Sequence, residues 1–192
     1  ARHDAGRRFG ARFGARFGTV SRRAPPGSRR GAAVRVKTAR GRKPSSTRWL
    51  QRQLNDPYVR AAGDAGYRSR AAFKLIELDE RFGLLKGAMR VLDLGAAPGG
   101  WSQVARQRLA AGASVTAVDI SPLQPLAGVR VLQLDALDGA SLAAMREALG
   151  GAADLVLSDM AAPSTGHAGT DHIRVMALCE AALDIGEAML GE

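Results

Sequence analysis

The sequence predicts an α/β protein built on a doubly wound, mainly parallel sheet. Short apolar runs alternate with longer amphipathic segments over the second half of the chain. Each apolar run is continuous, as expected for strands whose two faces are both covered by helices. The first run leads directly into a glycine-rich turn, "RVLDLGAAPGGW" from Arg90 to Trp101. A strand followed by such a turn is typical of sheets that bind nucleotides at the carboxyl ends of their strands.

The expected elements follow one another in a regular order. An apolar stripe in "YRSRAAFKLIELDERFGLL" predicts a helix, with Ser69 as its N-cap and Gly83 near its end. The later elements are strand Met89–Gly95, helix Gly100–Leu109, strand Ser114–Ile120, strand Val129–Leu134, helix Ser141–Leu149, strand Ala153–Ser158 and helix Thr170–Leu190. Upstream, Trp49, Leu50 and Leu54 have helical spacing, and "DPYV" indicates a turn. We therefore expect one folded domain over residues 45–192.

The N-terminal part differs sharply in composition. The chain has 192 residues and a net charge of +10, and residues 1–48 hold 15 of its 28 Lys and Arg against the single Asp4. Low complexity, as in "RRFGARFGARFG", predicts that residues 1–44 are disordered. Because each cation that meets a phosphate releases counterions, nucleic acid is the expected partner. A solubilising tail, or a start that is not native, is the alternative.

The composition also bears on membranes, metals and compartment. The sequence has no apolar run of about 18 residues, so we expect no membrane partner. His167 and His172 have no partners at ligand spacing, so no metal site is predicted. We also expect the protein to be a monomer. Cys179 is alone and lies in an apolar helical stripe, which predicts a core position. We expect a cytoplasmic protein, although the Arg-rich start also suits a mitochondrial or plastid transit peptide.

The glycine-rich turn indicates which cofactor the sheet binds. A dinucleotide turn has a glycine at its second conserved position so that backbone N–H groups can approach a pyrophosphate. Here that position is Ala97, and Pro98 removes one N–H from the loop. The turn Gly95 to Gly100 is therefore poorly suited to phosphate. It favours a cofactor without phosphate that offers a nucleoside and an amino-acid end, which is S-adenosylmethionine.

Acidic residues stand at or just after the end of each predicted strand. They are Asp93, Asp119, Asp135 and Asp159. Asp119 is placed to accept both ribose hydroxyls, a feature shared with NAD enzymes, and Asp135 is placed to accept from an adenine amino group. Asp159 is aimed at the same cleft, where it could hold an ammonium group or position a lysine. The simpler interpretation is that these residues only cap strand-to-loop turns.

Four motifs in this order resemble one known family. "SSTRWLQRQLNDPYV", "GYRSRAAFKL", "VLDLGAAPGGWSQV" and "SDMAAPSTG" are similar to segments of the FtsJ family of 2′-O-ribose methyltransferases that act on large-subunit ribosomal RNA. The resemblance covers about Pro44 to Leu190. It implies a Rossmann-like methyltransferase fold, S-adenosylmethionine as cofactor, and a uridine of the peptidyl-transferase-centre A-loop as target. The resemblance also assigns cofactor contacts, which by position are Gly99, Trp101, Asp119, Asp135 and Asp159, beside Gly95 and Gly100 of the turn. Trp101 could instead pack in the core.

The resemblance also implies a reactive centre. The family uses a Lys-Asp-Lys-Glu set, and Lys74 and Asp159 match its first lysine and its aspartate. The second lysine, which is the family's favoured base, and the glutamate belong to later strands, and this sequence stops before them, so we interpret it as truncated. Arg68, Arg70 and Lys74 form a basic edge that is suited to RNA phosphates. Without the resemblance, Lys74 would be interpreted as part of a solvated helix face.

Two other classes of protein compete with the RNA 2′-O-methyltransferase. An NAD-dependent oxidoreductase is disfavoured by Ala97 and Pro98. A non-catalytic RNA-binding protein is supported by the basic tail and by the absent second lysine. Within the methyltransferases, transfer RNA is the alternative substrate.

Overall fold

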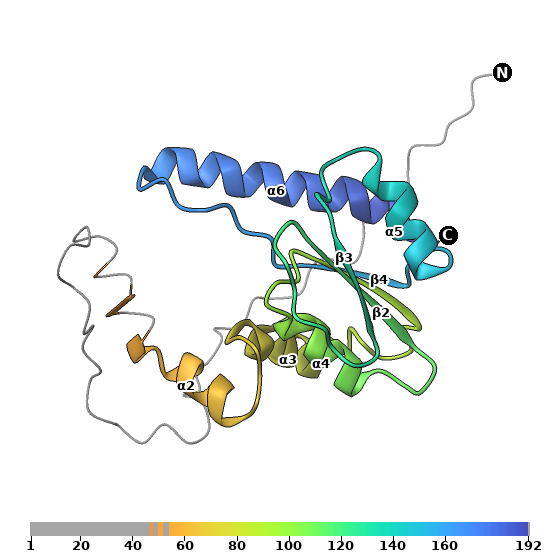
Figure 1. Ribbon diagram of the computed structural model, residues 1–192, viewed down its shortest axis with the longest axis horizontal. Coiled ribbons are helices and arrows are strands. Elements are labelled where there is room, and N and C mark those ends of the chain that lie inside the picture. The colour runs from red at the N-terminus through yellow and green to blue at the C-terminus, as the bar shows by residue number, and fades with distance from the viewer. Residues whose placement is uncertain (1–46, 48–49, 52–53, 192) are drawn as a thin grey trace.

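A computed structural model describes residues 47, 50–51 and 54–191 (Figure 1). The disordered tail predicted for residues 1–44 and the domain boundary at residue 45 lie outside the described residues, so both stay predictions. Among the described residues, no helix has the length and apolarity needed to cross a membrane.

Four parallel strands form the sheet, as the sequence predicts. They are β1 (Arg90–Leu94), β2 (Ser114–Asp119), β3 (Val129–Gln133) and β4 (Leu155–Ser158). Their order across the sheet is β3-β2-β1-β4, so β1 lies inside the sheet and pairs with β2 and with β4. Because all four strands are parallel, their carboxyl ends lie at one edge of the sheet, where ligands of such sheets bind.

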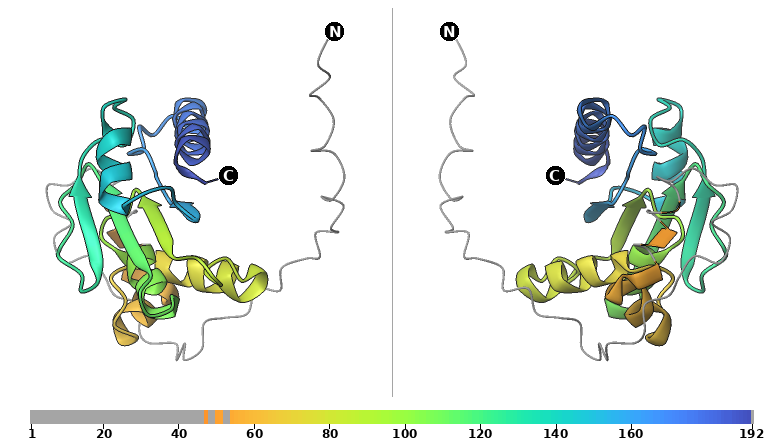
Figure 2. Two further views of the ribbon diagram at one scale, coloured as in Figure 1. Left: turned by 90° about the vertical axis from the view of Figure 1, so that its right-hand side faces the viewer. Right: turned by 90° about the vertical axis from the view of Figure 1, so that its left-hand side faces the viewer.

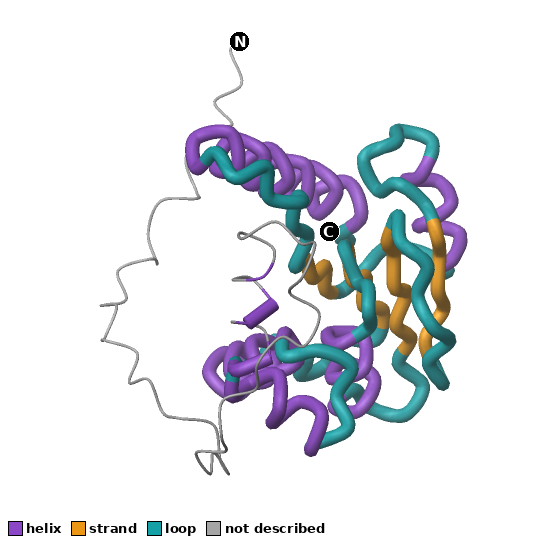
Figure 3. The backbone as a smooth tube through the Cα atoms, turned by 60° about the vertical axis from the view of Figure 1, so that its left-hand side comes forward, coloured by secondary structure: helices purple, strands orange, loops and turns teal. Residues whose placement is uncertain are grey.

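Helices cover both faces of this sheet (Figure 2). Helices α3 (Ala71–Phe82) and α4 (Gly100–Arg108) pack on one face, around a core that includes Val91, Leu75 and Trp101. Helices α5 (Ser141–Leu149) and α6 (Ala168–Met189) pack on the other face, around Leu92 and Met145. Figure 3 shows the strands between these two groups of helices. This double coverage explains why residues 91–94 of β1 and 115–118 of β2 are all buried.

The segment "DPYV" is a helix start, so the predicted turn is wrong. Helix α2 spans Pro57–Asp64, and the carboxylate of its N-cap Asp56 accepts the N–H of Tyr58 at 2.9 Å. Proline suits the first helical position because its fixed φ is already helical and the N–H that it lacks has no partner there. An aspartate followed by proline therefore begins a helix here.

The predicted N-cap of the next helix is also wrong. Helix α3 begins at Ala71, and Arg70 occupies the N-cap position without a side-chain hydrogen bond to the helix. Ser69 lies against Gly100 instead, so closely that a side chain on Gly100 would collide with Ser69 Oγ. A tertiary contact between the start of α4 and the segment before α3 thus takes the place of a local cap.

Cys179 is exposed, which contradicts the predicted core position. Helix α6 buries residues near its C-terminal end, Ile185, Gly186 and Met189, whereas Ile173 is 69% exposed and Leu183 is 64% exposed. Figure 1 shows that the N-terminal part of α6 extends past the sheet. An apolar stripe in this helix therefore does not place Cys179 in the core.

Candidate functional site

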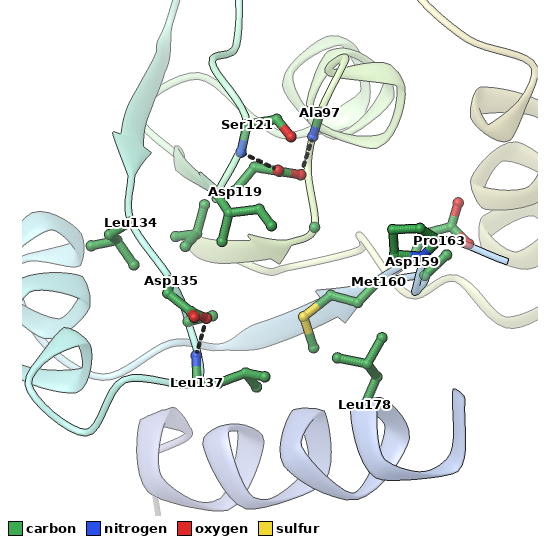
Figure 4. Close-up of a pocket in the computed structure, with 15 residues that line it drawn as sticks. Ala97, Asp119, Ser121, Leu134, Asp135, Leu137, Asp159, Met160, Pro163 and Leu178 are labelled. Atoms are coloured by element: carbon green, nitrogen blue, oxygen red, sulfur yellow. Dashed lines mark hydrogen bonds between the residues drawn. The ribbon is translucent and has the colours of Figure 1, made fainter. Parts of the chain in front are cut away.

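A cavity of roughly 420 Å³ lies at the carboxyl edge of the sheet, within the usual size of small-molecule sites. Residues that follow each of the four strands line it, and Leu178 of α6 closes one side (Figure 4). Of the residues predicted to bind a cofactor, the cavity is lined by Gly95, Asp119, Asp135 and Asp159. The parallel sheet brings them together because each lies at or just after the end of a strand.

Asp119 joins the two loops at the centre of the cavity wall. Its Oδ2 accepts the N–H of Ala97 at 2.9 Å, and its Oδ1 accepts the N–H of Ser121 at 2.7 Å. Figure 4 shows both bonds. The carboxylate is half-buried and keeps acceptor positions free for a ligand. It is therefore fixed in direction before any ligand arrives.

The N–H groups of the glycine-rich turn are used within the protein. Gly95 and Ala96 donate to the carbonyl of Val118 at 2.9 and 3.1 Å, and Gly99 donates to Ala96 at 2.6 Å. Ala97 donates to Asp119, and Pro98 has no N–H. From residue 95 to residue 99 no backbone donor remains for a pyrophosphate. This bonding agrees with the sequence argument against a dinucleotide.

Asp135 follows β3, the strand next to Asp119. Asp119 pairs in register with Gln133, so Asp135 lies two residues beyond that pair on the neighbouring chain segment. Its Oδ1 accepts the N–H of Leu137 at 2.9 Å, and the residue is exposed. Both aspartates therefore cap turns, as in the simpler interpretation, and also line the cavity; their contacts with a cofactor stay predictions.

Lys74 and Asp159 meet at the other side of the cavity. Lys74 Nζ lies 2.9 Å from Asp159 Oδ1, and the lysine side chain is 64% exposed. In Figure 4, Asp119 and Asp135 lie on one side of the cavity and Asp159 on the other, with the side chain of Met160 between them. A ligand that fills this space would reach from two carboxylates at one end to the Lys74–Asp159 ion pair at the other.

A buried acid lies under the turn and was not among the predicted site residues. Asp93 in β1 is 1% exposed, and Ser102 Oγ donates to its Oδ2 at 2.5 Å. Burial raises the pKa of Asp93 to about 7; hydrogen bonds from Ser102 oppose this shift, and the charges of Asp159 and Asp119 add to it. In sequence, the only indication is a serine in the first turn of the helix that follows the strand.

The glycines of the turn and Trp101 shape the site, and of these four residues Gly95 alone lines the cavity. Gly95 has φ +71°, and a Cβ there would lie 2.8 Å from the Met160 Cα, so the close approach of β1 and β4 requires glycine. Gly99 and Gly100 begin α4 and, like Trp101, do not line the cavity. Trp101 is buried in the core, and its Nε1 donates to the carbonyl of Ala71 at 2.7 Å. Cofactor contacts for these three residues stay predictions.

Two of the three residues of the predicted basic edge line a second cavity, of roughly 480 Å³, which shares Gly95, Ala97 and Asp159 with the first; Lys74 does not line it. Arg68 and Arg70 lie on its wall. Arg70 forms an ion pair with Asp56, and Arg68 donates to three backbone carbonyls. The two guanidinium groups therefore have partners within the protein, and an RNA contact for either stays a prediction. Among the described residues, no group of three His, Cys, Asp or Glu side chains is arranged to hold a metal ion.

The amino-acid sequence matches a known protein family. A family model described as FtsJ-like methyltransferase matches residues 67–192. This range includes the glycine-rich turn, Lys74 and the four strand-end aspartates, Asp93, Asp119, Asp135 and Asp159. The chain belongs to the FtsJ-like methyltransferase family. The FtsJ-like fold thus agrees with the resemblance found in the sequence.

Named relatives of this FtsJ-like chain are ribosomal RNA enzymes. Ribosomal RNA large subunit methyltransferase E of Sphingopyxis alaskensis is 60% identical over 158 residues, covering 82% of this chain and 68% of that protein. The protein of the same name from Rhodospirillum rubrum is 59% identical over 171 residues, covering 87% and 65%. A crystal structure of a ribosomal RNA methyltransferase from Plasmodium falciparum is 30% identical with a TM-score of 0.59, covering 65% of this chain and 73% of that one. The chain spans about two thirds of the length of the curated relatives that it matches.

Proposed function

We propose that this protein binds S-adenosylmethionine in the cavity at the sheet edge and directs its methyl group to the 2′-hydroxyl of a uridine in large-subunit ribosomal RNA. One arrangement carries the proposal: an acidic cavity, beside a turn whose residues 95–99 keep no N–H for phosphate, adjoins the Lys74–Asp159 ion pair. Membership in the FtsJ-like family and the names of the relatives support the choice of RNA. We propose the cytoplasm as the compartment, because the substrate is part of a ribosomal subunit.

The residues of the cavity fit this cofactor. S-adenosylmethionine carries a sulfonium and an ammonium charge and no phosphate, and three carboxylates, those of Asp119, Asp135 and Asp159, line the space. Ribose hydroxyls and an adenine amino group are donors, and Asp119 and Asp135 are acceptors that are held by backbone N–H groups. A pyrophosphate between the same carboxylates would meet negative charge and, from residue 95 to residue 99, no free backbone donor.

The chemistry depends mostly on alignment. When bound, the cofactor supplies an electrophilic methyl group, and the acceptor oxygen must approach it in line. Lys74 and Asp159 lie 2.9 Å apart beside the shared wall of the two cavities, so they can hold the acceptor hydroxyl or its phosphate at that wall. Lys74 is cationic in this ion pair, which makes it a positioning group and a poor proton acceptor. We assign proton removal to no residue among those described.

The test is transfer of labelled methyl from S-adenosylmethionine into RNA. Protein expressed from the whole gene is incubated with large ribosomal subunits, free large-subunit RNA or transfer RNA, and methylated riboses are located by their resistance to alkaline cleavage. We expect label at one uridine ribose of large-subunit RNA. Lys74→Ala should lower the rate, whereas the control Lys86→Ala, an exposed lysine that lines neither cavity, should not.

Each other outcome selects a different function. Label in transfer RNA alone would move the substrate to transfer RNA. RNA binding without label in any RNA would favour a non-catalytic RNA-binding protein and would overturn the proposal.

A further inference from the structure

Arg68 connects the two loops that form the cofactor cavity, from outside that cavity. Its guanidinium donates to the carbonyls of Gln124 and Pro125 at 2.6 Å each, and to the carbonyl of Pro98 at 3.4 Å. Gln124 and Pro125 belong to the loop that follows Asp119, and Pro98 belongs to the glycine-rich turn. Arg68 itself does not line the cofactor cavity.

The segment that carries Arg68 is fixed to the body of the protein. The backbone N–H of Arg68 donates to Gln103 Oε1 at 3.0 Å, and Gln103 Nε2 donates to the carbonyl of Gly66 at 2.9 Å. The stem of Arg68 packs over Gly99, where a Cβ would lie 3.1 Å from Arg68 Cδ. The guanidinium therefore reaches the two loops from a base that helix α4 holds in place.

Inside the cavity, Asp119 joins the same two loops. It accepts Ala97 N–H from the turn and Ser121 N–H from the following loop. The turn and the loop are thus held together from two sides, by Asp119, which lines the cofactor cavity, and by Arg68, which lines the second cavity. Without the outer tie, the loop could shift and carry the Asp119 carboxylate with it.

We infer that Arg68 is a positioning residue for cofactor binding. Arg68 holds residues 124–125 against Pro98, and it thereby fixes Asp119 in the direction that the cofactor ribose needs. The inference rests on the proposed function, because it takes S-adenosylmethionine as the ligand. It assigns Arg68 to the cofactor site rather than to the RNA phosphates that the sequence suggested. Arginine is required because its planar fork donates to several carbonyls at once, whereas a lysine ammonium is a compact charge on a flexible stem.

The experiment compares Arg68→Lys with the wild type in two titrations. Calorimetry measures the Kd for S-adenosylmethionine, and fluorescence anisotropy measures the Kd for a large-subunit RNA fragment at several salt concentrations. We expect Arg68→Lys to raise the cofactor Kd roughly tenfold, about the value of a hydrogen bond to a charged group. We expect Arg68→Ala, which removes the charge, to leave the salt slope of RNA binding unchanged. Arg130→Lys is the matched control, because Arg130 also donates to a backbone carbonyl, that of Ala148 at 2.7 Å, but lines neither cavity that holds the site.

A double-mutant cycle separates positioning from a general effect on the fold. If Arg68 acts through Asp119, then Arg68→Lys costs little extra cofactor affinity in an Asp119→Asn background, so the two effects are not additive. Asp119→Asn keeps one acceptor oxygen, which keeps binding measurable. Additive effects would contradict the inference, as would a cofactor Kd that Arg68→Lys leaves unchanged.

The remaining outcomes are also decisive. A salt slope that falls by about one unit in Arg68→Ala, with normal cofactor affinity, would make Arg68 a phosphate contact and would overturn the inference alone. A wild-type protein that does not bind S-adenosylmethionine would overturn the proposed function, and the inference with it.

Discussion

Asp93→Asn should change how the stability of the protein depends on pH. Asp93 is 1% exposed, Ser102 Oγ donates to its Oδ2, and its Oδ1 has no hydrogen-bond partner among the described residues. Burial raises the pKa of Asp93 from 3.8 to about 7. An asparagine at this position has nearly the same shape and still accepts from Ser102, but it cannot ionise.

The sign and size follow from proton linkage. Between pH 4 and pH 7 the folded state binds more protons at Asp93 than the unfolded state does, so the free energy of unfolding falls as the pH rises. Each pKa unit is worth about 1.4 kcal/mol, so the whole shift corresponds to roughly 4 kcal/mol. Because Asp93 is already about half ionised at pH 7, the interval from pH 5 to pH 7 accounts for roughly 2 kcal/mol. Asp93→Asn removes this contribution, so the variant should gain stability relative to the wild type as the pH rises.

Urea unfolding followed by circular dichroism at pH 5, 6, 7 and 8 measures this difference. We expect the free energy of unfolding of Asp93→Asn minus that of the wild type to increase by roughly 2 kcal/mol from pH 5 to pH 7, and to change little above pH 8. The exposed Asp64 gives a matched control, Asp64→Asn, whose curve should run parallel to the wild type. Parallel curves for Asp93→Asn as well would refute the assignment of a protonated carboxyl at Asp93.

Three further predictions concern the same region. Gly95→Ala should lower the free energy of unfolding by about 2 kcal/mol or more, because φ is +71° and the new Cβ would lie 2.8 Å from Met160 Cα. The control Gly63→Ala, whose Cβ would have nothing within 4 Å, should be neutral or stabilising. Equal effects of the two variants in urea unfolding would contradict this prediction. Ser102→Ala should cost about 1–3 kcal/mol and should cost more at pH 8 than at pH 5, since the ionised Asp93 then loses its donor; a loss that is the same at both pH values would count against the pair. Binding of S-adenosylmethionine near pH 7 should release part of a proton from Asp93. The charges of Asp119 and Asp159 help to raise the pKa of Asp93, and a cationic ligand between these two carboxylates lowers that pKa again. Calorimetry in buffers of different ionisation enthalpy should show the proton release in the wild type and its loss in Asp93→Asn.

The sheet and the acids of the site could be predicted because both depend on short-range pattern. Apolar runs identified β1 to β4. Because parallel strands end at one edge of a sheet, the sequence predicts that Asp119, Asp135 and Asp159 share one cleft, and all three line the cavity. The family resemblance, and not the pattern, assigned Lys74 and Asp159, 85 residues apart in sequence, to one reactive centre; the ion pair between them was not predicted.

Contacts between distant loops could not be predicted in the same way. Arg68 donates to carbonyls 56 and 57 residues away, and backbone carbonyls leave no mark in a sequence. Ser69 looked like an N-cap because caps are local, yet Gly100 of another helix occupies its surroundings. Cys179 lies in an apolar stripe that predicts burial, but the buried residues of α6 are near its C-terminal end, at Ile185, Gly186 and Met189. Each of these errors comes from tertiary packing that overrides a local preference.

The most direct test of the account is calorimetric titration of the folded protein with S-adenosylmethionine and, separately, with NAD. We predict saturable binding of S-adenosylmethionine that weakens at least tenfold in Asp119→Ala, and no binding of NAD, because residues 95–99 of the turn have no free N–H for a pyrophosphate. Binding of NAD in preference to S-adenosylmethionine, or S-adenosylmethionine binding that is unaffected by Asp119→Ala, would contradict it.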